Sequence, residues 1–226
     1  LEQYPNATVV GSKAALQFME QFGYKPQNTL LVKAGDTLDL GGLTLQFIAA
    51  PMVHWPEVMM SYCPEEKTLF SADAFGSFGV RNAHPDNWAD EARRYYTNIC
   101  GKYGMPVSMV LSKIHTLDIQ TIAPLHGCML VGEQLAEALR LYDIWSSYRI
   151  ESEGALVAYA SIHGNTAKVA HRVAEALRAK GMEVKEIDLC RSDVSEAVSQ
   201  AFRYSKMVLC ASSYDSGVFP PMHIFL

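Results

Sequence analysis

Three polar side chains, each just beyond an apolar run, are the residues best suited to bind a metal. His54 lies in PMVHWPEVMM, Asp73 in TLFSADAFG and His126 in TIAPLHGC. Loops at the ends of neighbouring strands can bring such side chains to one point, and imidazole with carboxylate suits Fe, Zn or Mn. One such residue alone is more often structural. Three at successive strand ends favour a metal site.

A second candidate site follows Tyr159, in YASIHGNTAKVAHRVAEALRAKG. The apolar run before Ser161 predicts a buried strand, and apolar residues from Val169 onward recur at helical spacing. A short loop between strand and helix leaves backbone N–H groups free at the first helical turn, where the helix dipole also attracts an anion. With Ser161, Asn165 and Thr166 as further donors, the loop is predicted to hold a phosphate. The alternative is an ordinary capped helix start.

The elements around this loop predict a doubly wound α/β unit. Strands are expected over 182–190 and 206–213, with a helix over 195–205, which completes a βαβαβ order. The loop lacks GxGxxG and GxxxxGK[ST], so it fits neither a dinucleotide fold nor a P-loop nucleotidase. Open α/β sheets bind ligands at the carboxyl ends of their strands. A second loop is therefore expected to meet the same ligand through Ser213, Tyr214, Asp215, Ser216 and Gly217.

The elements that must position the three metal-ligand candidates form a different, mixed α and β pattern. Strand pairs with tight turns dominate it. Strands are expected over 8–10, 30–35, 36–51, 58–63, 68–75 and 121–125, and helices over 12–23 (capped by Ser12), 86–99, 107–114 and 132–147. The polar stretch SSYRIESEG separates the two patterns, which predicts domains at 1–150 and 154–226.

Composition and charge narrow the class of protein. The 226 residues are 49% hydrophobic with a net charge of −5, which is ordinary for a globular protein and excludes a nucleic-acid-binding surface built on excess basic charge. No apolar run is long enough to span a membrane and the first residues lack a signal core, so we expect a cytoplasmic protein. The five cysteines have no CxxC spacing and are expected to be buried free thiols.

The motifs together resemble the flavodiiron proteins, or A-type flavoproteins. His54 in His-Trp-Pro-acid, Asp73 in Ser-Ala-Asp-x-Phe-Gly and His126 in Pro-x-His-Gly are similar to the metallo-β-lactamase-like domain of that family. The Ser-x-x-Gly-Asn-Thr loop resembles the phosphate loop of flavodoxins, and the order of the two domains is that of the family. The resemblance covers residues 4–226. It implies the C-terminal part of an α+β, αββα domain followed by the first half of a flavodoxin-like domain.

The resemblance also implies cofactors and roles. Asp73 would bridge two irons, with His54 a ligand of one and His126 of the other, and electrons from FMN would reduce dioxygen to water or nitric oxide to nitrous oxide. FMN would be bound by the second loop and, in the first, by Ser161, Ile162, His163, Gly164, Asn165 and Thr166. An electron donor such as a rubredoxin or an NAD(P)H-linked reductase and a head-to-tail homodimer are implied as well.

The family's remaining metal ligands come from a His-x-Glu-x-Asp-His segment, which this sequence does not contain. His84 and His115 lie in helical or loop contexts and do not replace it. We therefore expect a fragment truncated at both ends and inactive alone, with Trp55 and Tyr62 as candidates for the wall of the metal pocket. Two other functions stay open, a metallo-hydrolase and an FMN-binding electron-transfer module without a working metal site.

The metal hypothesis makes a geometric prediction. Metal–ligand bonds of about 2.0–2.2 Å require a carboxylate oxygen of Asp73 within about 5 Å of a ring nitrogen of each of His54 and His126, with all three side chains at one cleft.

Overall fold

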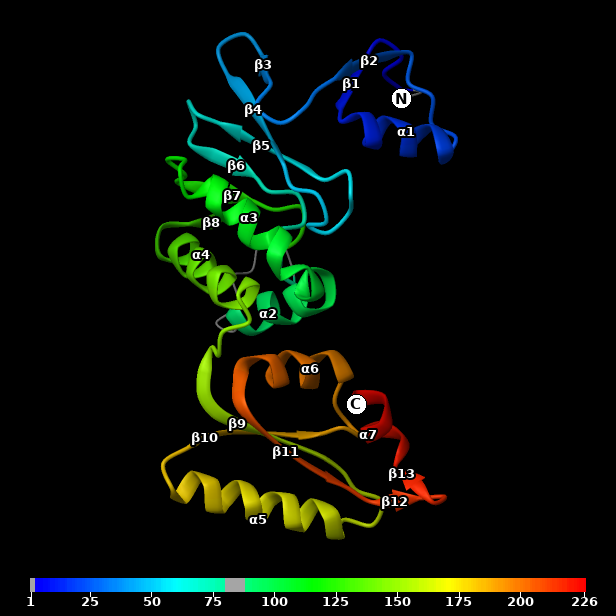
Figure 1. The fold of residues 1–226 in the computed structure, drawn as a ribbon, viewed down its shortest axis with the longest axis vertical. Helices are drawn as coiled ribbons and strands as arrows, with labels where there is room; N and C mark the ends of the chain where they lie inside the picture. Colours follow the sequence, from blue (N-terminus) through cyan, green and yellow to red (C-terminus); the bar gives the residue numbers. More distant parts are fainter. Residues whose placement is uncertain (1–2, 80–87) are drawn as a thin grey trace. The chain divides into compact units, whose positions relative to one another are not determined.

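The computed structural model describes residues 3–79 and 88–226, which form two compact units, Leu1–Ser147 and Tyr148–Leu226. Each unit has its own sheets and helices (Figure 1). No helix in the described ranges is long and apolar enough to cross a membrane.

The first unit is built on a mixed sheet of six strands in the order β3-β4-β5-β6-β7-β8. The strands are β3 (Thr37–Asp39), β4 (Thr44–Ala49), β5 (Met59–Cys63), β6 (Thr68–Phe70), β7 (Thr121–Ala123) and β8 (Leu130–Val131). A smaller parallel pair, β1 (Thr8–Gly11) and β2 (Asn28–Leu31), flanks α1 (Lys13–Gln21). The side chain of Ser12 accepts a hydrogen bond from the backbone amide of Ala15, as expected for the helix cap predicted from the sequence.

Helices cover one face of the six-stranded sheet. They are α2 (Trp88–Ile99), the short 3₁₀ turn η1 (Gly101–Tyr103), α3 (Gly104–Ile114) and α4 (Gly132–Ser146). The side chains of Leu69, Ile122 and Leu130 are paired across β6, β7 and β8 and are fully buried. Phe70 and Val131, one position further along, are half exposed on the opposite face, because successive side chains of a strand alternate.

The second unit is a parallel sheet in the order β10-β9-β11, with helices on both faces (Figure 1). Its elements are β9 (Ser152–Ala160), α5 (Asn165–Ala179), β10 (Glu183–Asp188), α6 (Val194–Arg203), β11 (Tyr204–Ala211), β12 (Ser213–Tyr214), β13 (Gly217–Val218) and α7 (Pro220–Phe225). The last seven residues of β9 are all buried. The central strand of a sheet covered on both faces must be apolar throughout, which is the pattern its sequence has.

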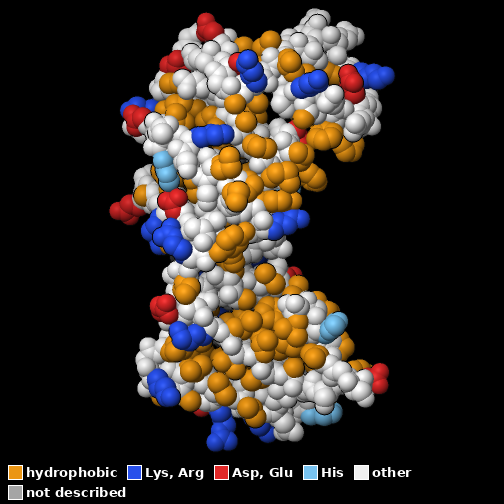
Figure 2. All heavy atoms as spheres, in the orientation of Figure 1, with side chains coloured by type: hydrophobic (Ala, Val, Ile, Leu, Met, Phe, Trp, Pro, Cys, Tyr) orange, Lys and Arg blue, Asp and Glu red, His pale blue; other side chains and the backbone are white. Residues whose placement is uncertain are grey.

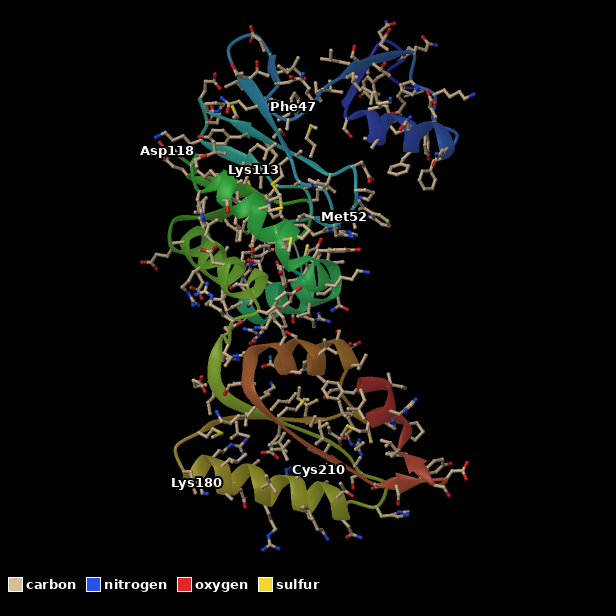
Figure 3. The ribbon with its side chains drawn as sticks, in the orientation of Figure 1. Phe47, Met52, Lys113, Asp118, Lys180 and Cys210 are labelled. Atoms are coloured by element: carbon tan, nitrogen blue, oxygen red, sulfur yellow. The ribbon has the colours of Figure 1, made fainter. Side chains whose placement is uncertain are left out.

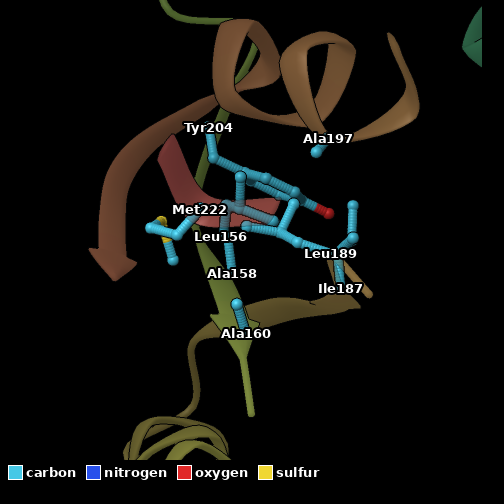
Figure 4. Close-up of a cluster of buried hydrophobic side chains, with 8 residues drawn as sticks. All are labelled: Leu156, Ala158, Ala160, Ile187, Leu189, Ala197, Tyr204 and Met222. Atoms are coloured by element: carbon cyan, nitrogen blue, oxygen red, sulfur yellow. The ribbon is translucent and has the colours of Figure 1, made fainter. Parts of the chain in front are cut away.

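Two apolar clusters form the core of this unit, one on each side of β9. Figure 4 shows the larger one, in which Tyr204, Met222 and Ala197 meet the side chains of Leu156 and Ile187. The smaller one holds Val157 and Tyr159 against Ala170 and Ala174 of α5.

Several details differ from the sequence-based predictions. The strand expected over 68–75 ends at Phe70, the helix expected from residue 107 begins at Gly104, and β8, the β12–β13 hairpin and α7 were not predicted. The predicted start of the helix at residue 86, and His84 beside it, lie outside the described residues. The five cysteines are free, but only Cys63 and Cys100 are buried and Cys190 is exposed, so the prediction of buried thiols is wrong for that residue.

Candidate functional site

Sheet topology brings the three predicted metal-ligand residues to one edge of the first unit. Strands β4 and β6 are both antiparallel to β5, so they run in the same direction, and β7 is parallel to β6. Their carboxyl ends therefore lie at the same edge. His54, Asp73 and His126 follow β4, β6 and β7, respectively.

The carboxylate of Asp73 lies between the two histidines and divides its oxygens between them. Nε2 of His54 is 3.3 Å from Oδ2, and Nε2 of His126 is 3.3 Å from Oδ1. The geometric prediction on distance is confirmed. Two ligands of one metal with bonds of about 2.0–2.2 Å lie about 3–3.5 Å apart, so each histidine and its facing oxygen could share one ion. One carboxylate would then bridge two ions.

Each pair offers only two ligands to its ion. In the ranges 3–79 and 88–226 no group of three or more His, Cys, Asp or Glu side chains could hold a single metal ion by itself. A cavity of about 570 Å³ beside α1 is lined by other residues, including Ser12, Lys33 and Glu57.

Backbone hydrogen bonds join the loop of Asp73 to the loop of His126. The amide of Leu125 donates to the carbonyl of Ala72 at 2.8 Å, and the amide of Ser77 donates to the carbonyl of His126 at 3.4 Å. Gly127 has φ +86°, and a Cβ there would overlap Oγ of Ser77. The glycine after His126 is therefore needed for both conformation and space.

Left-handed backbone is concentrated around the same loops. Met52 (labelled in Figure 3), Ala72 and Phe75 have φ of 64°, 53° and 64°, respectively. Residues other than glycine rarely adopt this region, and such strain persists where the surroundings hold it. From α3, Nζ of Lys113 donates to the carbonyl of Ala49 at 3.1 Å, which ties the start of the His54 loop to the helix layer.

Tyr95 of α2 is a site residue that the sequence did not reveal. Its buried ring lies 5.7 Å from that of His126, and a Cβ on Gly76 would meet its ring at 2.8 Å. Burial, and then the charge of Asp73, raises the pKa of the Tyr95 hydroxyl well above its ordinary value. The phenol is therefore neutral beside the carboxylate. Helix α2 contains three aromatic residues, and no local sequence pattern distinguishes Tyr95 from the other two.

Of the two candidates for the pocket wall, only Trp55 lies at the site. Its ring is 5.0 Å from that of His54 and more than half exposed. Tyr62 is buried on the helix-covered side of the sheet, where its hydroxyl donates to the carbonyl of Asp118 at 2.7 Å. Tyr62 is therefore a core residue. His115 ends α3, as its sequence context predicted.

The second unit has a cavity of about 410 Å³ at the loop between β9 and α5. It is lined by Ser161, Ile162, His163, Asn165, Thr166, Ser212 and Ser213. Gly164 has φ +82°, and its amide donates to Oγ of Ser161 at 3.1 Å. Oγ of Ser212 and Oγ1 of Thr166 are 3.0 Å apart, which joins the predicted phosphate loop to the second loop. The amides at the start of α5 are placed for an anion.

The second predicted loop is a tight hairpin. Ser213 pairs with Val218 and Tyr214 with Gly217, and Asp215 and Ser216 have φ of 46° and 58° at the turn. Two central residues with positive φ match the right-handed twist of a hairpin. Ser213 is the one predicted residue of this loop among those that line the cavity. Tyr214 instead packs against Phe219, with ring centroids 5.8 Å apart.

Comparison with known proteins matches both units. Residues 1–127 match the family model described as ODP family beta lactamase, and residues 157–224 match that of flavodoxin. The crystal structure of the flavodiiron protein from Giardia intestinalis superposes with a TM-score of 0.91 at 25% identity, over 99% of this chain and 56% of that one. The rubredoxin oxygen:oxidoreductase from Desulfovibrio gigas shares the fold, with a TM-score of 0.85 at 24% identity over 96% of this chain and 57% of its own.

Curated relatives support the same family. A diflavin flavoprotein A 1 of Synechocystis is 32% identical over 92% of this chain and 38% of its own length. A nitric oxide reductase of Moorella thermoacetica is 29% identical over 97% of this chain and 57% of its own length. This chain spans between 35% and 58% of the first relatives it matches. With a β-lactamase-like domain of the ODP family followed by a flavodoxin-like unit, the chain belongs to the flavodiiron proteins.

Proposed function

We propose that this chain is part of an oxidoreductase that uses FMN and a pair of irons to reduce dioxygen to water or nitric oxide to nitrous oxide. The observation that carries the proposal is the carboxylate of Asp73, with one oxygen 3.3 Å from each of two histidines. Residues 1–150 are proposed as the diiron domain and 154–226 as the FMN-binding domain.

The three side chains fit the donor set that a diiron centre needs. His54 with Oδ2 of Asp73 would hold one iron, and His126 with Oδ1 the other, as two neutral imidazoles and one shared negative charge. Each position then lacks further ligands among residues 3–79 and 88–226, and we propose a His-x-Glu-x-Asp-His segment elsewhere in the full-length protein. When bound, the two irons and FMN would supply electrons in pairs to a small diatomic substrate.

The flavin-binding role rests on the cavity at the β9–α5 loop. Amides at the start of α5 and the hydroxyls of Ser161 and Thr166 would hold the phosphate of FMN, because the free N–H groups and the helix dipole both favour an anion. The hairpin of Tyr214 to Gly217 follows Ser213 at the rim, where we propose that it meets the flavin ring.

Substrate and donor are proposed from the relatives' names. These include a nitric oxide reductase, a coenzyme F420H(2) oxidase of Methanothermobacter marburgensis and an anaerobic nitric oxide reductase flavorubredoxin of Vibrio vulnificus. Dioxygen or nitric oxide as substrate and a rubredoxin-type donor fit those names. We also propose an NAD(P)H-linked reductase as an alternative donor and a head-to-tail homodimer as the assembly.

The test uses the full-length protein, with iron and FMN measured per chain and the consumption of dioxygen and nitric oxide followed with a chemical reductant. Asp73→Asn keeps the side-chain shape but removes the charge that a bridge requires. It should lower the bound iron from two per chain to one or fewer and abolish both reductions, while FMN stays at one per chain. Asp118→Asn, at an exposed carboxylate paired with Lys67, is the control.

Two results would reject the proposal. A protein that binds FMN but no iron would be an electron-transfer module, and one that hydrolyses esters or amides with a metal but reduces neither gas would be a metallo-hydrolase.

A further inference from the structure

The turn that presents Asp73 depends on an unfavourable backbone conformation two residues further on. Phe75 is fully buried and has φ 64°, a region in which a bulky side chain is a genuine outlier. Ser71 steadies the start of this turn, because its buried hydroxyl donates to the carbonyl of Ala74 at 2.7 Å. Nothing in the local sequence favours a left-handed phenylalanine. A contact from outside the turn must hold it.

That contact comes from Tyr142 of α4, 67 residues away in the sequence. The amide of Phe75 donates to the hydroxyl oxygen of Tyr142 at 2.6 Å, and the two rings lie 4.2 Å apart with an angle of 30° between their planes. Tyr142 is itself held between Tyr96 and Trp145, at ring distances of 5.1 Å and 5.5 Å. Its hydroxyl is therefore a fixed acceptor in a rigid aromatic layer.

We propose that Tyr142 is the positioning residue for the Asp73 carboxylate, acting through Phe75. Its role in metal binding rests on the proposed diiron function. Without the hydroxyl, the buried amide of Phe75 has lost its acceptor, and a buried donor without an acceptor is unfavourable. The turn then relaxes toward ordinary backbone angles, which rotates Asp73 away from His54 and His126.

The test compares Tyr142→Phe with wild type by NMR on the 226-residue protein. The variant keeps the ring stack and removes one hydroxyl. We expect the amide of Phe75 to exchange with solvent at least tenfold faster, and the NOEs from the Asp73 side chain to both imidazoles to be lost, while the amide of Ile122 keeps its protection. Tyr62→Phe removes another buried hydroxyl with one hydrogen bond and should leave all of these signals unchanged.

Two further measurements separate the possible failures. In wild type, the Phe75 amide must be as protected as that of Ile122, and fast exchange there overturns the proposal even if Tyr142→Phe does not fold. Retention of the Asp73 NOEs in Tyr142→Phe also overturns it. In the full-length protein, Co²⁺ should bind at least tenfold more weakly to Tyr142→Phe than to Tyr62→Phe. If wild type binds no Co²⁺ but Tyr142→Phe loses the NOEs, the positioning role stands and the diiron function fails.

Discussion

One carboxylate facing two histidines through different oxygens is an arrangement with two physical explanations. A hydrogen-bonded His-Asp-His group would stabilise the loops, and a bridged metal pair would use the same separations of 3.3 Å. The side chain of Asp73 is 15% exposed and that of His126 is 59% exposed. A purely structural group gains little from an exposed imidazole, because exposed ion pairs contribute about 0–1 kcal/mol. The exposure of His126 therefore favours a ligand-binding role.

The glycine after His126 gives a prediction with an internal control. Gly127→Ala places a methyl group against Ser77 in backbone with φ +86°, whereas Gly23→Ala has the same φ and open space around it. Both variants carry the left-handed penalty of about 1–2 kcal/mol. Gly127→Ala should lose a further 1–3 kcal/mol or so of unfolding free energy from overpacking. Denaturant unfolding measures both variants, and equal losses would mean that the Ser77 loop moves aside freely.

The phosphate loop gives a second prediction at residue scale. Ser161→Ala with Thr166→Ala removes two hydroxyls at the cavity. FMN affinity in the full-length protein should fall by about 30–150-fold, at roughly 1–1.5 kcal/mol for each lost hydrogen bond, while riboflavin affinity changes little. Fluorescence titration with both flavins checks this, with Ser205→Ala on β11 as control. Equal weakening of both flavins would place the phosphate elsewhere.

At the scale of elements, α5 is joined to β10 by a cluster of charged side chains. Glu186 of β10 accepts one hydrogen bond from Arg178 at 2.6 Å and pairs with His171 at 2.5 Å, both on α5. Burial acts to raise the pKa of Glu186, but the bonds from His171 and Arg178 outweigh it and hold that pKa below its ordinary value. The ionised carboxylate therefore stabilises the fold.

This cluster predicts a pH dependence. The stabilisation is present above the unfolded-state pKa of about 4.3 and is lost as the pH falls through the lower folded-state value. Glu186→Gln should therefore lower the unfolding free energy by about 1–2 kcal/mol at pH 7 and by much less near pH 3. Glu137→Gln breaks an exposed pair with Arg140 and should cost about 0.3–0.5 kcal/mol. A Glu186→Gln deficit that persists undiminished at pH 3 would contradict this account.

The elements that could be predicted are those whose signals are local. The apolar run of β9, the Ser12 cap and the Gly41–Gly42 turn are each determined by residues that are close together in the sequence. The strand predicted through Phe75 ends at Phe70, and the segment after it makes a contact with Tyr142, far away in the sequence, which no local pattern reveals. Tyr95 was missed for the same reason, since helical spacing does not say which aromatic residue meets Asp73. The start of α7 at Pro220 did have a local signal, a proline at the first helical position.

At the scale of the whole molecule, each unit has its own core and its own candidate site. Figure 2 shows hydrophobic side chains gathered on one face of the second unit. In that unit β11 is an outer strand of the sheet, and Met207 and Leu209 on it are 48% and 39% exposed. An outer strand with exposed apolar residues is a natural place for further pairing. This chain also spans only part of the length of its relatives. The stability of each unit is therefore best measured separately.

Two cores, each with its own candidate site, predict two separable unfolding transitions for the full-length protein. Calorimetry should resolve them, because a ligand that binds only the folded form of one unit raises the midpoint of that unit alone. FMN should shift the transition of Tyr148–Leu226, and Co²⁺ that of Leu1–Ser147. Asp73→Asn should remove the Co²⁺ shift and leave the FMN shift intact, while Ser161→Ala with Thr166→Ala should do the reverse. A single transition moved by both ligands in every variant would show that the units unfold as one body and that neither site belongs to one unit alone.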